Sequence, residues 1–123
     1  MTVLLPARAL ALACLVALPL GACVSVPVNS TTGRATELAT LVSRSIACRA
    51  GSPRRDTLDR FLTAEAERGA TPEQIASARS TYITVSEAQT INQGIRPERC
   101  DAEERAGLKD RMTRVRAGSF EAL

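Results

Sequence analysis

In four separate stretches of the chain, apolar residues recur every three or four positions, which is the period of a helix that buries one face. The first stretch is expected to begin at Thr36, whose hydroxyl can cap a helix, and to end near Gly51. In the second, Ser52 and Pro53 are the residue types preferred at the cap and first position of a helix, and Gly69 is expected to end it. These signals predict the first two helices.

The third helix is predicted from a capping box. Thr71 and Gln74 stand three positions apart and can each satisfy a backbone amide of the other. The helix is expected to end near Asn92 or Gly94. The β-branched run at 81–85 is typical of a strand, but the caps and the length of the periodic stretch favour a helix.

A second capping box, Asp101 with Glu104, predicts the start of a fourth helix, and Gly118 is expected to end it. Four amphipathic helices joined by short loops are typical of a small all-α four-helix bundle. We therefore expect one helical domain over residues 35–118, followed by a C-terminal tail at 119–123.

The N-terminal segment resembles a bacterial lipoprotein signal. One positive residue, Arg8, precedes an apolar run at 9–20, and the sequence Leu-Gly-Ala-Cys follows at 20–23. The resemblance implies that residues 1–22 are removed and that Cys23, the new first residue, receives lipid. The alternative is an ordinary cleaved secretory signal whose last residues match a lipoprotein signal by chance.

Residues 23–34 contain several helix breakers and no helical period, so they are expected to form a flexible tether between the lipid and the domain. The alternative is that Val24, Val26 and Val28 alternate as an edge strand, for which the sequence offers no evident partner. Retention of the signal as a membrane helix is disfavoured because the apolar run is short and contains Pro19.

Two cysteines remain once Cys14 leaves with the signal and Cys23 is lipidated. A lipoprotein of this kind faces an oxidising periplasm, which favours a disulfide between Cys48 and Cys100. A metal site is the alternative, but two cysteines without any histidine do not supply a zinc ligand set. We expect no metal at these residues.

Composition limits the function. The chain contains no histidine, which removes histidine-dependent nucleophilic catalysis and the usual general base. The glycines stand singly, so there is no glycine-rich phosphate loop, and the formal charge of +3 is too small to indicate nucleic-acid binding. We therefore expect a protein that is not an enzyme and has no cofactor and no small-molecule substrate.

The order of features resembles the small pilotin lipoproteins of type II secretion systems. A lipidated Cys23, a tether, a helix ending at Cys48 and a last helix opening at Cys100 follow one another, and the likeness spans residues 35–117. The resemblance implies that the helical domain binds a segment of a secretin subunit and that the lipid carries the complex to the outer membrane. Val24, where an aspartate would favour the inner membrane, agrees with this location.

A partner segment is expected to lie in a groove between helices, and the candidate contact residues are Leu58, Phe61, Ile75 and Tyr82. The alternative for each of them is ordinary core packing. Two other functions compete with the pilotin hypothesis. One is a periplasmic stress chaperone that opens at low pH, and the other is a structural lipoprotein of the envelope.

Overall fold

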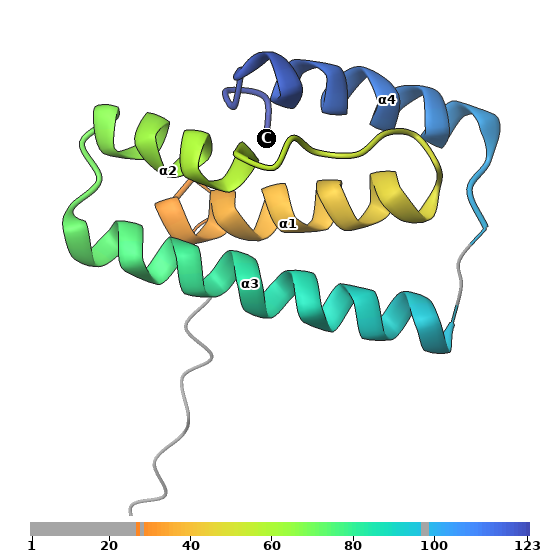
Figure 1. Ribbon diagram of the computed structural model, residues 1–123, viewed down its shortest axis with the longest axis horizontal. Helices are drawn as coiled ribbons and strands as arrows, with labels where there is room; N and C mark the ends of the chain where they lie inside the picture. Colours follow the sequence, from red (N-terminus) through yellow and green to blue (C-terminus); the bar gives the residue numbers. More distant parts are fainter. Residues whose placement is uncertain (1–26, 28, 97–98) are drawn as a thin grey trace, which may run out of the picture.

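The structure is a computed structural model that describes residues 27, 29–96 and 99–123 (Figure 1). Within these residues lie four helices: α1 (Thr31–Ala47), α2 (Thr57–Glu67), α3 (Pro72–Ile95) and α4 (Ala102–Ala117). The prediction of an all-α four-helix domain is confirmed. The signal at 1–22, the lipidation site Cys23 and residues 24–26 and 28 of the predicted tether lie outside the described residues.

Helix α1 lies in the middle of the domain, with α3 along one side and α4 along the other (Figure 1). It runs in the same direction as α3 and opposite to α2 and α4. Its main packing partners are α3 and α4, and α2 packs on α3. Among the described helices, none is both long enough and apolar enough to cross a membrane.

Helix α1 begins six residues earlier than the sequence predicts. Its cap is Ser30, whose hydroxyl accepts a hydrogen bond from the Gly33 amide at 3.0 Å, while Thr36 lies inside the helix. The Ser30 amide also donates to the Pro27 carbonyl, which forms a turn just before the helix. Residues 31–34 of the predicted tether therefore belong to the first turn of α1.

The predicted start of the second helix is wrong. Helix α2 begins at Thr57, and Ser52 and Pro53 belong to the loop that connects it to α1. The reason is tertiary, because the Ser52 carbonyl accepts a hydrogen bond from the Arg116 guanidinium on α4 at 2.7 Å. Gly51 in the same loop passes close to α4, where a Cβ would lie 3.2 Å from Met112 Cγ.

The predictions for α3 are confirmed at its start. Thr71 and Gln74 form both hydrogen bonds of the capping box, at 2.8 and 3.3 Å. The β-branched run at 81–85 is helical, and the helix continues to Ile95, one residue past the later of the two predicted ends. A strong cap and a long periodic stretch therefore outweigh the strand preference of five consecutive residues.

The helix ends at glycine are also confirmed. Gly69 and Gly118 have φ angles of 99° and 89°, in the left-handed region that glycine tolerates best. Helix α1 has no glycine at the corresponding place: Arg49 adopts φ 53° there. The Arg49 amide donates to the Ile46 carbonyl and the Ala50 amide to the Ser45 carbonyl, which is the Schellman pattern with an arginine in the position glycine normally takes.

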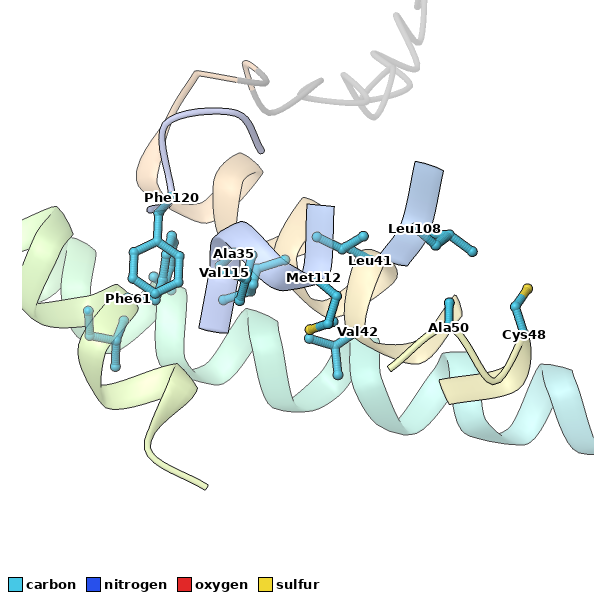
Figure 2. Close-up of a cluster of buried hydrophobic side chains, with 13 residues drawn as sticks. Ala35, Leu41, Val42, Cys48, Ala50, Phe61, Leu108, Met112, Val115 and Phe120 are labelled. Atoms are coloured by element: carbon cyan, nitrogen blue, oxygen red, sulfur yellow. The ribbon is translucent and has the colours of Figure 1, made fainter. Parts of the chain in front are cut away.

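The core is built mainly from α1, α2 and α4 and the C-terminal tail (Figure 2), and α3 contributes Ala78 to it. Its largest fully buried apolar side chains are Phe61, Leu38 and Met112. Phe61 meets Phe120 of the tail edge to face, with ring centroids 5.6 Å apart. The tail at 119–123 is therefore partly a core element, whereas the sequence placed the end of the domain at 118.

The predicted disulfide between Cys48 and Cys100 is confirmed, with the two Cα atoms 5.6 Å apart. Cys48 is the cap residue at the end of α1, and Cys100 precedes Asp101, the cap at the start of α4. The Asp101 carboxylate accepts a hydrogen bond from the Glu104 amide at 2.7 Å, which is one of the two hydrogen bonds of the predicted capping box. The disulfide thus joins the ends of two antiparallel helices.

Candidate functional site

The four predicted contact residues do not come together in one groove. Phe61 is completely buried and belongs to the core. Leu58 and Ile75 are half-buried at the edge of the core cluster. Tyr82 is also half-buried, and it lines a shallow groove between α1 and α3. Of the four, Tyr82 is the one that the structure places in a groove.

The groove between α1 and α3 has a volume of about 310 Å³. Tyr82 of α3 faces Val42 and Ile46 of α1 across it, and Ile46 is 53% exposed. Burial raises the pKa of the Tyr82 hydroxyl above its ordinary value of 10.0, so the side chain is neutral at physiological pH. This groove offers apolar contact but little charge.

A larger groove, of about 550 Å³, runs between α1 and α4. Its floor is apolar, since Leu41 and Leu108 lie there and are almost completely buried. Thr36 and Thr40 of α1 form one wall, and Gly107 of α4 lies in the other. We call this feature the α1–α4 groove.

Gly107 has no side chain that could fill the α1–α4 groove. It stands in the interior of α4, where glycine costs roughly 1 kcal/mol relative to alanine. A Cβ placed there would meet no heavy atom within 4 Å, so no close contact within the chain requires the glycine. Its effect is to leave the backbone of α4 accessible from the groove.

An ion pair closes one end of the α1–α4 groove. Arg44 of α1 donates from Nε and Nη2 to the two carboxylate oxygens of Glu104 on α4, at 2.5 and 2.9 Å. These hydrogen bonds hold the pKa of Glu104 below its ordinary value of 4.5. The nearby Arg105 donates to the Cys48 carbonyl at 3.0 Å, so the disulfide end of the two helices is fixed by covalent and charged contacts together.

Two further charged residues line the α1–α4 groove: Glu37 on α1 and Arg111 on α4. Neither forms an ion pair or a side-chain hydrogen bond with any of the described residues. Both therefore remain available to groups that enter the groove. An apolar floor with one free charge on each wall can orient an amphipathic segment as well as bind it.

One group of potential metal ligands comes together among the described residues. Cys48, Cys100 and Glu104 have ligand atoms within 4.8 Å of one another. The two sulfur atoms are bonded to each other, and the Glu104 carboxylate accepts hydrogen bonds from Arg44. The group is therefore engaged in holding α1 and α4 together.

Sequence reasoning missed the α1–α4 groove. The helical period continues through Gly107 and gives no sign of a groove, although a glycine in a helix interior is itself a signal of close approach or of an open surface. The pairing of Arg44 with Glu104 joins residues 60 positions apart, and no local pattern shows it.

No protein-family model, no curated protein and no solved structure matches this chain. The class of protein is therefore defined by what the structure describes: an all-α four-helix domain with a Cys48–Cys100 disulfide and grooves on both sides of its central helix.

Proposed function

We propose that the mature chain is a lipid-anchored binding module of the bacterial envelope, facing the periplasm, and that it holds an amphipathic segment of an envelope protein in the α1–α4 groove. A secretin subunit is the candidate partner, in line with the resemblance to pilotins. The observation that carries the proposal is the open, apolar-floored groove beside Gly107.

The groove suits a single slender segment. Apolar side chains of the segment would cover Leu41 and Leu108, and each such side chain is worth about 1.5–3 kcal/mol when fully buried. The missing side chain at Gly107 lets the backbone of the segment approach α4 closely. A basic residue opposite Glu37 and an acidic one opposite Arg111 would fix its direction.

The proposal requires no catalysis and no cofactor. The sequence has no histidine, and the charged side chains at the groove are two free residues and one ion pair. Such a set suits recognition of a charged and apolar segment better than proton transfer.

Lipidation of Cys23 would hold the module at the membrane, and we place it at the outer membrane. Several acyl chains on one residue anchor a protein firmly, whereas one chain of myristoyl length binds only reversibly. Incorporation of labelled palmitate into the expressed chain, and its loss in Cys23→Ser, tests this part of the proposal. An unlabelled wild-type chain would overturn it.

The groove is tested by blocking it. Gly107→Phe adds a large side chain at a position where a Cβ meets no heavy atom within 4 Å, and Ala106→Phe is the matched control on an exposed position next to it. The lipidated wild-type and variant proteins are used to capture proteins from envelope extracts, and captured secretin is identified by mass spectrometry. We expect secretin with wild type and Ala106→Phe, and a loss of at least tenfold with Gly107→Phe.

Two results would contradict the proposal in different places. Equal recovery of secretin by both variants would remove the α1–α4 groove as the binding site. Recovery of no secretin by the wild-type protein would remove the secretin as the partner.

A further inference from the structure

Helix α3 is the longest helix and buries the least of itself. Its 24 residues include one that is completely buried, Ala78, on the side that packs toward α1. Three isoleucines of the same helix are exposed: Ile83 by 46%, Ile91 by 62% and Ile95 by 70%. Large apolar side chains that are mostly exposed on one helix mark a contact surface more often than scattered single ones.

The three isoleucines share one face. Their spacing of eight and four positions places them within an arc of about 120° at 100° per residue, on the side of α3 opposite Ala78. Between Ser80 and Ile95, the helix carries a single charged residue, Glu87. Glu87 stands four positions from both Ile83 and Ile91, so its exposed carboxylate lies on the same face. We call this isoleucine-bearing surface the outer face of α3.

The chain between the lipidation site and the domain is short. Pro27, four residues after Cys23, already belongs to the turn that precedes α1. Four residues span at most about 14 Å. Since α1 and α3 run in the same direction, both helices start at the end of the domain from which this segment leaves (Figure 1). A lipid at Cys23 would therefore hold the start of α3 close to the bilayer.

We propose that the outer face of α3 lies on the bilayer that carries the lipid anchor, with Ile83, Ile91 and Ile95 inserted among the lipid headgroups. The inference rests on the proposed lipidation of Cys23. We infer a phospholipid surface as the binding partner of this face because the lipid anchor and the short connection keep the helix close to the membrane. The effective concentration of the surface is then high, so the contact of three side chains is sufficient for binding.

This orientation leaves the α1–α4 groove free. Helices α3 and α4 flank α1 on opposite sides, so a domain that rests on α3 presents α4 away from the membrane (Figure 1). Helix α3 is about 36 Å long, so it would lie along the surface rather than cross it. The binding site would then open toward the periplasm.

The experiment uses reporter tryptophans, because the chain has none of its own. Ile91→Trp places one on the outer face of α3, and Thr113→Trp places the matched control on an exposed position of α4. Both are prepared as lipidated full-length mature proteins in phosphatidylethanolamine and phosphatidylglycerol vesicles, with and without brominated lipid. We expect strong quenching and a blue shift for Ile91→Trp and little of either for Thr113→Trp.

A second set of variants tests the neighbouring side chains. In the Ile91→Trp background, replacing Ile83 and Ile95 by serine should reduce the quenched fraction, with each half-exposed isoleucine contributing roughly a three- to tenfold change in partitioning. Flotation of the same proteins with the vesicles reports the lipid anchor independently. Absence of flotation would overturn the lipidation itself, whereas flotation without quenching of Ile91→Trp would overturn only the contact of α3.

A third outcome would replace the bilayer by a second copy of the chain. In that case Ile91→Trp would shift to the blue without lipid quenching, and the shift would depend on protein density in the vesicle. That result would also overturn the proposal.

Discussion

Arg34 Nε lies 2.8 Å from Glu65 Oε1, and both side chains are more than 90% buried. Arg34 comes from the first turn of α1 and Glu65 from the last turns of α2. The same guanidinium donates from Nη2 to the Phe120 carbonyl at 2.7 Å. One buried arginine therefore connects the start of α1, the end of α2 and the C-terminal tail.

Removing the acidic partner of this pair should be costly. Glu65→Gln keeps the shape of the side chain but leaves the Arg34 charge buried without its counter-charge. We expect the free energy of unfolding to fall by about 3–5 kcal/mol, measured by urea denaturation. The control is Asp59→Asn, which breaks an exposed pair with Arg79 and should cost less than about 1 kcal/mol. Equal losses would show that burial of the first pair has no energetic effect.

Removal of the disulfide should destabilise the domain without changing its helical fold. The bond closes a loop of 52 residues, for which chain entropy predicts a loss of about 4 kcal/mol in Cys48→Ser with Cys100→Ser. Denaturation followed by circular dichroism measures the loss. A double variant as stable as wild type would mean that Arg44 with Glu104 and Arg105 with the Cys48 carbonyl hold the helix ends together unaided.

Substitution by alanine should change the stability of the domain in opposite directions at Gly107, inside α4, and at Gly118, at the end of α4. At Gly107 the space is open and the backbone helical, so Gly107→Ala should stabilise the domain by about 0.5–1 kcal/mol. At Gly118 the φ of 89° disfavours alanine and a Cβ would collide with the Arg60 guanidinium, so Gly118→Ala should destabilise it. Thermal unfolding of the two variants under identical conditions measures the signs, and a shift in the same direction for both would contradict this account.

Arg49 provides a further test of backbone strain. Its φ of 53° is the left-handed conformation that glycine adopts at lower cost. Arg49→Gly should therefore stabilise the domain, by about 1 kcal/mol at most, despite the loss of a side chain. Arg49→Ala relieves no φ strain and is the control. A higher denaturant midpoint for Arg49→Ala than for Arg49→Gly would contradict backbone strain at Arg49.

Acid should destabilise the domain only well below neutral pH. Arg44 and Arg54 hold the pKa values of Glu104 and Asp56 below their ordinary values of 4.5 and 3.8. A carboxylate with a lowered folded pKa contributes stability above its unfolded pKa and loses that contribution as pH falls through the folded value. With no histidine to titrate, stability should be nearly constant from about pH 8 to about pH 5.5 and fall below about pH 4.5.

Denaturation across this pH range checks the expectation, with Glu104→Gln as the variant in which part of the acid loss should disappear. An unfolding step or exposure of apolar surface near pH 6 would instead favour the acid-stress chaperone that competes with the proposed function.

The parts of the fold that local sequence predicts are those with a local cause. The capping box of Thr71 with Gln74 and the left-handed glycines Gly69 and Gly118 need only neighbours in the chain, and they mark helix ends correctly. The wrong start of α2 has a distant cause. The loop carbonyl of Ser52 is held by Arg116, 64 residues away, which keeps Ser52 and Pro53 out of α2.

The same division applies to the candidate site. The disulfide could be predicted by counting cysteines, because only Cys48 and Cys100 remain once Cys14 and Cys23 are assigned to the signal and the lipid. The contact residues could not, because apolar periodicity finds a helix face without saying whether another element covers it. Phe61 is covered by Phe120 from the tail, whereas Tyr82 meets a gap between α1 and α3.

Helices α1 and α4 are fastened at both extremities. The Cys48–Cys100 bond fixes one extremity, and at the opposite one Arg34 of α1 holds the tail that follows α4 through the Phe120 carbonyl. Under the proposed function, a bound segment would therefore lie along a groove whose two helices are held together at each end, and binding would not require them to separate.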